Sequence, residues 1–197
     1  VLPATTLAQS VPGDRPTYSI GEPLLRYLFS SSIANLTTNV LSSNFMENSY
    51  SVMWLYDPNT SAQASPTYNE ILSLVTDTND IISVCGYYTG SVLGFGLFFN
   101  GTVQSSFSLP STVNNTFLMS LTCANNQFSL SVYRFNSPLS NDSCSMLLTN
   151  PQITQLVLGR TQAVASTLAY KIGDVFILPF NATKKDAQKL IGFIQSR

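Results

Sequence analysis

The chain has 197 residues, a formal net charge of −1 and no histidine. Its length suits one domain with a full core, and a 44% share of hydrophobic residues excludes a disordered chain. The longest apolar run, Val92–Phe99, is too short to span a membrane, and the small net charge does not favour a nucleic-acid backbone.

Charged residues make up only 10% of the chain, so serine, threonine, asparagine and glutamine must supply most of the wet surface. Such a neutral, hydrogen-bonding surface suits sugar hydroxyls and crowded protein assemblies. A compositional bias of the source genome is the alternative cause.

The first part of the chain carries few periodic signals. Three prolines predict an extended arm over residues 1–17, followed by a single β-rich domain over residues 18–197. A strand is expected at 51–56, ended by the turn signal Asp57-Pro58-Asn59. Residues 65–75 fit either a short helix that begins at Ser65-Pro66 or a strand.

From residue 81 onward the pattern predicts antiparallel strands. Asp77 to Asp80 reads as a turn, and strands are expected at 81–88, 92–99, 103–109, 117–123 and 128–132. Asn100-Gly101 is the strongest hairpin signal, because both residues accept the positive φ of a type I′ turn. A loop is expected over 136–150, followed by strands at 154–159, 163–170 and 174–180.

The last segment changes from strand to helix periodicity. Thr183 and Asp186 have capping-box spacing, and the apolar residues that follow recur at helical intervals: Ala187, Leu190, Ile191 and Ile194. A helix is therefore predicted over about 183–195. Its apolar stripe must be buried, so we expect a β-sheet that needs this helix to complete its core.

The predicted fold is mainly β with a minor α part: a twisted antiparallel β-sheet packed around a C-terminal helix. A galectin-like β-sandwich is the alternative. Gly94 and Gly96 share one face of their strand with Phe98, which leaves room for a close neighbour. We expect that neighbour to be the C-terminal helix.

Cysteine usage does not indicate a disulfide scaffold. Cys85, Cys123 and Cys144 are odd in number and form no Cys-x-x-Cys pair. Cys85 and Cys123 sit in apolar strand patterns, which favours buried thiols over a disulfide. One disulfide plus a free thiol stays open as the alternative.

Without histidine the usual Ser-His-Asp and Cys-His arrangements cannot form, and the commonest zinc ligand is missing. Catalysis would have to use carboxylates, and the candidate pairs are Asp77 with Asp80 and Asp57 with Glu70. A turn and a helix start explain these residues more simply. The sequence therefore predicts no catalytic residue, no metal site and no cofactor.

A sugar site needs an aromatic face and fixed polar groups. The candidate glycan-binding residues are aromatic or basic side chains at strand ends and turns: Trp54, Tyr56, Tyr87, Tyr133, Arg134 and Arg160. Trp54 also fits a core position, and the others fit the wet face of a sheet.

The chain resembles the glycan-binding head that trypsin releases from a rotavirus outer-capsid spike protein. The resemblance rests on length, on Asn/Ser/Thr-rich composition, on the Trp-containing strand SVMWLYDP, and on the basic end at Arg197 after a polar helix. It is closer in character to a divergent, non-group-A (group B-like) head than to the galectin-like group A heads, whose sugar-contacting residues it does not carry.

This resemblance implies a non-enzymatic, lectin-like viral attachment domain on the virion surface. Its expected partners are host cell-surface glycans, of galactose/N-acetyllactosamine type or sialylated, and the remainder of the spike protein. Neither nucleic acid nor membrane insertion is expected, and assembly would take place in the host cytoplasm and endoplasmic reticulum. Arg197 would be the processing end. The alternatives are a carbohydrate-active enzyme with a carboxylate pair and a ligand-free structural capsid domain.

Overall fold

A computed structural model describes residues 7–8, 17–20, 26–30, 35–38, 49–58, 67–110, 116–134, 141–149, 152–159 and 170–196. Within these ranges the strands form two sheets of seven strands each, and every pairing is antiparallel. Sheet A has the order β1 (Leu7–Ala8), β4 (Asn35–Thr38), β13 (Ile153–Gly159), β6 (Asn69–Thr76), β7 (Ile81–Tyr88), β8 (Val92–Phe99), β9 (Thr102–Pro110). Sheet B has the order β12 (Asn141–Leu147), β11 (Gln127–Arg134), β10 (Phe117–Ala124), β5 (Ser49–Pro58), β14 (Tyr170–Leu178), β3 (Arg26–Ser30), β2 (Thr17–Ile20).

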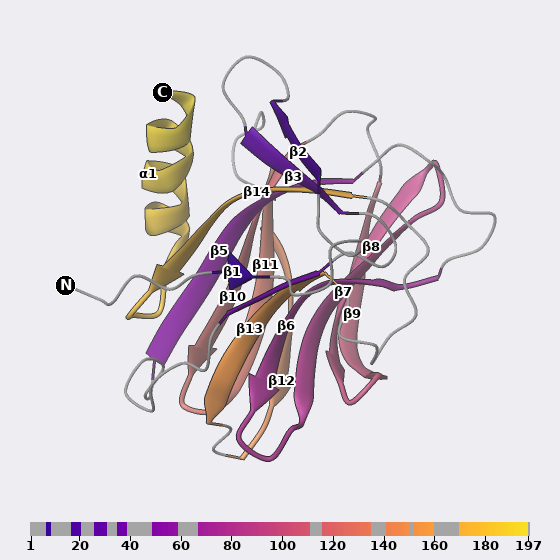
Figure 1. Cartoon of the computed structure of the whole chain (residues 1–197), viewed down its shortest axis with the longest axis vertical. Coiled ribbons are helices and arrows are strands. Elements are labelled where there is room, and N and C mark those ends of the chain that lie inside the picture. Colours follow the sequence, from indigo (N-terminus) through magenta and orange to yellow (C-terminus); the bar gives the residue numbers. More distant parts are fainter. Residues whose placement is uncertain are drawn as a thin grey trace.

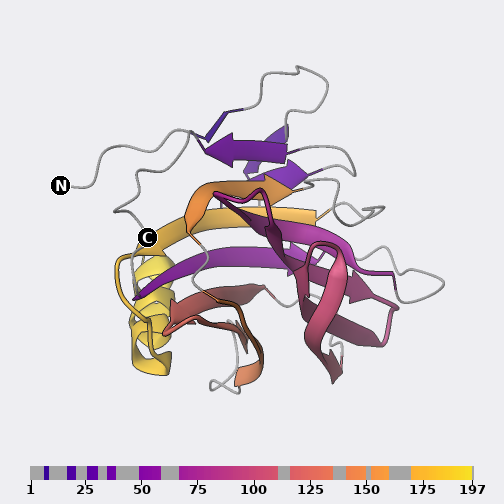
Figure 2. The same cartoon turned by 90° about the horizontal axis from the view of Figure 1, so that it is seen from below.

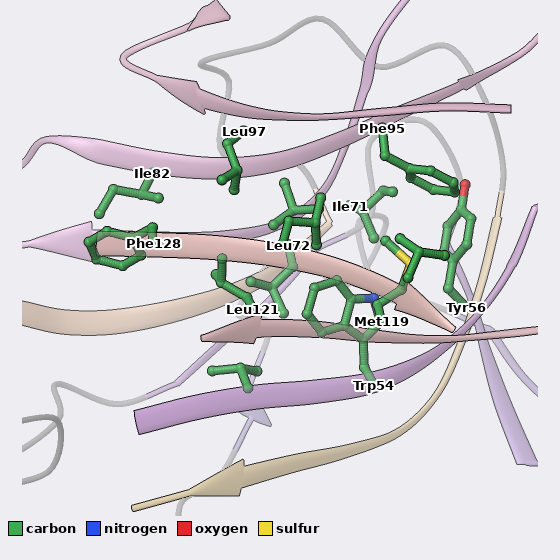
Figure 3. Packing of buried hydrophobic residues seen from close by; sticks show 14 of the residues in the cluster. Trp54, Tyr56, Ile71, Leu72, Ile82, Phe95, Leu97, Met119, Leu121 and Phe128 are labelled. Carbon is green, nitrogen blue, oxygen red and sulfur yellow. The ribbon is translucent and has the colours of Figure 1, made fainter. Parts of the chain in front are cut away.

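The main core lies between the two sheets. Side chains that alternate along each strand meet there, for example Trp54 and Met119 from sheet B and Ile82 and Phe95 from sheet A. Figure 3 shows these side chains pointing toward one another from facing strands. The molecule is thus a two-layered β-sandwich.

Within the part of the chain that the structure describes there is one helix, α1 (Lys184–Gln195), which follows β14. It stands outside the two layers, beside β5 and β14 (Figures 1 and 2). Its inward face and the outer face of sheet B form a second, smaller core, made of Met53, Leu55, Leu118, Tyr133, Ala187, Ile191 and Ile194. The prediction of a mainly β, antiparallel domain with a C-terminal helix is confirmed. The main core, however, contains no residue of α1, because a second sheet closes it.

The start of α1 follows the predicted capping box. The Thr183 side chain accepts a hydrogen bond from the Asp186 backbone N–H, and the Asp186 carboxylate accepts one from the Thr183 N–H at 2.9 Å. The buried Ser51 hydroxyl donates to the Phe180 carbonyl at 2.8 Å and accepts from the Ala182 N–H at 2.7 Å. Strand β5 therefore fixes the direction in which the chain enters the helix.

Strand β5 is buried on both faces, which explains why its sequence reads as a continuous apolar run. Val52 and Trp54 face the main core, whereas Met53 and Leu55 face α1. Two-sided burial is typical of a central strand that is covered by further layers on either side.

Several sequence expectations are corrected or resolved by the structure. The expected loop over 136–150 contains strand β12, in which Cys144 and Met146 are buried between exposed serines. Residues 69–75 lie in strand β6, as the strand alternative predicted, whereas residues 65 and 66 lie outside the described residues. The Asn100-Gly101 turn has the predicted positive φ angles of 48° and 78°.

The predicted arm over residues 1–17 lies mostly outside the described residues. Leu7–Ala8 pairs with β4, and Thr17 begins β2. The boundary between arm and domain stays a prediction, as does the strand over 163–170, of which only Tyr170 is described.

Gly192 offers a direct test of α1. A Cβ added at this position meets no atom within 4 Å, and glycine is a poor residue in the interior of a helix. We expect Gly192→Ala to raise the free energy of unfolding by about 0.5–1 kcal/mol, measured by urea denaturation. A decrease in stability would contradict the described surroundings of this residue.

Candidate functional site

The outer face of sheet A carries an aromatic surface over strands β6 to β9. Tyr87 lies opposite Gly94 on the neighbouring strand, and Gly94 lies opposite Ser108 on the next. In the same way Cys85, Gly96 and Ser106 form a row across β7, β8 and β9. Since Phe95 and Leu97 face the main core, these rows face away from it.

Three rings gather on this face, and we call Tyr68, Tyr87 and Phe98 the aromatic patch. Tyr68 contacts both other rings edge-on, with centroid distances of 4.9 Å to Tyr87 and 5.0 Å to Phe98. Tyr68 and Tyr87 are half-buried, and Phe98 is buried. Tyr68 therefore holds the position of Tyr87, whose ring remains partly open to solvent.

The two glycines of β8 make room for these rings. A Cβ on Gly94 would overlap the Tyr87 ring atoms Cε1 and Cζ, and one on Gly96 would lie 3.1 Å from Phe98 Cε2. The close neighbour predicted for this face therefore exists, but it is the aromatic patch. The expectation that α1 would be this neighbour is wrong, because α1 packs on the other sheet.

Hydroxyl groups border the patch on the side of β9. Ser106 and Ser108 are exposed on the strand that lies next to the glycines of β8. Burial raises the pKa of Tyr68, an effect that the neighbouring Ser106 side chain opposes. Tyr68 is therefore a neutral phenol at physiological pH.

A buried polar cluster lies next to the patch on β6 and β7. Glu70 Oε1 accepts hydrogen bonds from Ser83 Oγ at 2.6 Å and from Ser73 Oγ at 2.8 Å, and all three residues are fully buried. Glu70 is paired in register with Cys85, and burial is the main cause that raises the pKa of this thiol. These groups are satisfied inside the protein, so they support the sheet beneath the patch.

Three of the four candidate carboxylates, Asp57, Glu70 and Asp80, have polar or basic partners in the structure. Asp57 lies on sheet B, 3.5 Å from Lys171, whereas Glu70 lies on sheet A. Both carboxylate oxygens of Asp80 accept hydrogen bonds, from Asn100 Nδ2 at 2.8 Å and from Thr78 Oγ1 at 2.7 Å. Asp80 is thus part of a turn, and Asp57 and Glu70 lie on strands of different sheets.

The glycan-binding residues predicted from the sequence do not gather at one place. Trp54 and Tyr56 lie in the main core, and Tyr133 lies beneath α1. The physical reason is that sheet B is covered on both faces, by sheet A and by α1. Aromatic side chains that would be exposed on a sheet covered on one face only are therefore buried in this protein.

The remaining residues singled out in the sequence are Arg134, Arg160 and Arg197. Arg134 Nη2 donates to the Pro110 carbonyl at 3.2 Å, which joins the end of β11 to the end of β9. Arg160 and Arg197 lie outside the described residues. Of the six predicted residues, Tyr87 alone is described as part of the aromatic patch. Tyr68, Phe98 and Ser106 were missed, although the two glycines of β8 marked the face on which they lie.

The described residues show neither a metal site nor a membrane-spanning helix. No group of three or more Cys, Asp or Glu side chains in this part of the chain could hold a metal ion. Among the same residues no helix is both long and apolar enough to cross a membrane.

Comparison with known proteins gives a fold and no family. No family model matches the chain, and no curated protein matches its sequence. Solved structures do match. The fold resembles that of botulinum neurotoxin binding domains.

Three of these structures illustrate the likeness. The receptor-binding domain of mosaic serotype C/D has a TM-score of 0.63 at 13% identity, with 96% of this chain and 46% of that chain covered. A second structure is the one for which cell entry of botulinum neurotoxin type C is said to depend on interaction with two ganglioside molecules. It has a TM-score of 0.62 at 14% identity, with 97% of this chain and 47% of that chain covered. The binding domain of botulinum neurotoxin DC in complex with SialylT has a TM-score of 0.59 at 14% identity, with 92% of this chain and 45% of that chain covered. The chain thus spans less than half the length of each neighbour, and identities this low establish the fold alone.

Proposed function

We propose that this chain is a non-enzymatic attachment module that binds cell-surface glycans through the aromatic patch. The observation that carries the proposal is the Tyr87 ring, laid across Gly94, held by Tyr68 and bordered by the hydroxyls of Ser106 and Ser108. A flat ring suits the apolar face of a sugar, and fixed hydroxyls suit its hydrogen-bonding groups.

Two further observations support a role in attachment to host cells. One similar structure is a botulinum neurotoxin binding domain in complex with SialylT, and another belongs to a toxin whose cell entry depends on interaction with two ganglioside molecules. The sequence resembles a rotavirus spike head of the group B-like type. We therefore assign the module to a viral spike on the outer capsid, with host glycans and the remainder of the spike as its partners.

A glycan array with the chain, followed by titration of variants, tests the proposal. We expect Tyr87→Ala to abolish detectable binding, because it removes the stacking ring, and Tyr87→Phe to retain most of the affinity, because it removes only the hydroxyl. Phe193→Ala is the matched control, since it removes a ring that is 51% exposed on α1, on the other sheet.

Each alternative has its own outcome in this experiment. Binding that persists in Tyr87→Ala would place the site elsewhere on the chain. A blank array would favour a ligand-free structural domain, and turnover of an arrayed oligosaccharide would favour an enzyme.

A further inference from the structure

The turns at one end of sheet A are tied together by the side chain of Asn100. This residue is exposed at the β8–β9 turn, and its amide is engaged at both ends. Its Oδ1 accepts from the Ile81 backbone N–H at 2.8 Å, and its Nδ2 donates to Asp80 Oδ1 at 2.8 Å. Thr78 Oγ1 donates to the other oxygen of Asp80 at 2.7 Å. We call Thr78, Asp80 and Asn100 the turn clamp.

Asn100 is also followed by Gly101, and no other asparagine in the chain is followed by glycine. In such a pair the backbone nitrogen of the glycine can attack the side-chain carbonyl carbon of the asparagine. A C–N bond forms, ammonia leaves, and a cyclic succinimide results. Water then opens the ring to aspartate or isoaspartate. Glycine favours this attack because no side chain shields its nitrogen.

The turn clamp opposes this reaction. To reach the Gly101 nitrogen the Asn100 side chain must rotate, and rotation breaks its hydrogen bonds to Ile81 and Asp80. Once formed, the product cannot restore the clamp, because a carboxylate has no donor for Asp80. The two like charges would then lie at hydrogen-bonding distance and repel each other.

We propose that Asn100 is a deamidation site that its hydrogen bond to Asp80 protects, and that its conversion separates the two turns. The change goes in one direction: local opening breaks the hydrogen bonds that hold the Asn100 side chain and allows the reaction, and the reaction then prevents these bonds from forming again. The fraction of chains deamidated at Asn100 would therefore increase with the time that this end of sheet A has spent open.

The test measures deamidation at individual asparagines by peptide mapping and mass spectrometry of the full chain. Native wild type is compared with Asp80→Asn, which keeps an oxygen acceptor for Asn100, and with Asp80→Ala, which does not. We expect Asn100 to deamidate slowly in native wild type and in Asp80→Asn, and several-fold faster in Asp80→Ala. Deamidation of Asn100 should be fastest in the chain unfolded by urea. Asn125 and Asn126 are internal controls, because they also have positive φ in an exposed turn but precede no glycine.

Equal rates in native wild type and Asp80→Ala would overturn the protective role of Asp80. Equal rates at Asn100, Asn125 and Asn126 in urea would overturn the site itself. A second measurement tests the repulsion: Asn100→Asp should lower stability, and adding Asp80→Asn should restore part of the loss. No recovery in the double variant would contradict the proposed separation of the turns.

Discussion

Gly94→Ala should reduce glycan binding as strongly as Tyr87→Ala does, although it leaves every ring of the aromatic patch in the chain. The added Cβ would overlap the Tyr87 ring, so that the ring must leave its place on β8. Overpacking of this kind costs about 1–3 kcal/mol of stability where neighbours cannot yield. Because Tyr87 is half-buried, we expect its ring to swing outward and the loss to appear mainly in binding.

The control for this prediction is another glycine with open surroundings. Gly192→Ala adds the same methyl group to α1, where it meets nothing within 4 Å, and should leave glycan affinity unchanged. Affinity is measured by titration of an array hit, and folding by denaturation of each variant. Full affinity in Gly94→Ala, together with lost affinity in Tyr87→Ala, would show that binding does not need the ring in its described place.

A double-mutant cycle separates displacement of the ring from general damage to β8. If Gly94→Ala acts through Tyr87, its stability cost should largely disappear in the Tyr87→Ala background, because no ring is left to displace. Residues in direct contact show such non-additivity, whereas independent effects add. An unchanged cost would point to strain in β8 itself.

Features that depend on neighbours in the sequence could be predicted. The capping box at Thr183 and Asp186 and the turn at Asn100-Gly101 are both determined within a few residues, and both form as expected. The hairpins of β7, β8 and β9 in sheet A and of β10 and β11 in sheet B also follow from local alternation and turn signals, but the predicted meander changes sheet between β9 and β10, which no local signal indicates. Antiparallel strands and a terminal helix were therefore predictable from one sequence.

Features that depend on distant segments could not be predicted in this way. Trp54 and Tyr133 are interior because a second sheet and α1 cover sheet B, and neither cover is visible in the local pattern. Glu70 is tolerated inside because Ser73 and Ser83 supply hydroxyl donors, the latter from the next strand. Of the described candidates only Tyr87 lies in the aromatic patch, and its place at the end of a strand was the sequence signal for it.

Phe95→Ala should cause the largest loss of stability among the changes considered, about 3–5 kcal/mol. Phe95 is fully buried on β8, and its ring contacts rings of both sheets. The centroid distances are 5.9 Å to Tyr56, 6.1 Å to Phe117 and 5.9 Å to Phe107. Tyr56 and Phe117 belong to sheet B, so Phe95 joins the two layers, as its approach to Tyr56 in Figure 3 shows.

Comparison variants separate the loss of a buried ring from the loss of an exposed one. Urea denaturation of Phe95→Ala is compared with Phe95→Leu, which keeps most of the volume and should cost less, and with Phe193→Ala. The latter removes an exposed ring from α1 and should stay within about 0.5 kcal/mol of wild type. Since a typical domain is stable by only about 5–15 kcal/mol, Phe95→Ala could leave little folded protein, in which case Phe95→Leu supplies the measurement. A loss of unfolding free energy below about 1 kcal/mol for Phe95→Ala would contradict the tight packing of these four rings, because removing a well-packed aromatic side chain lowers stability by more than that.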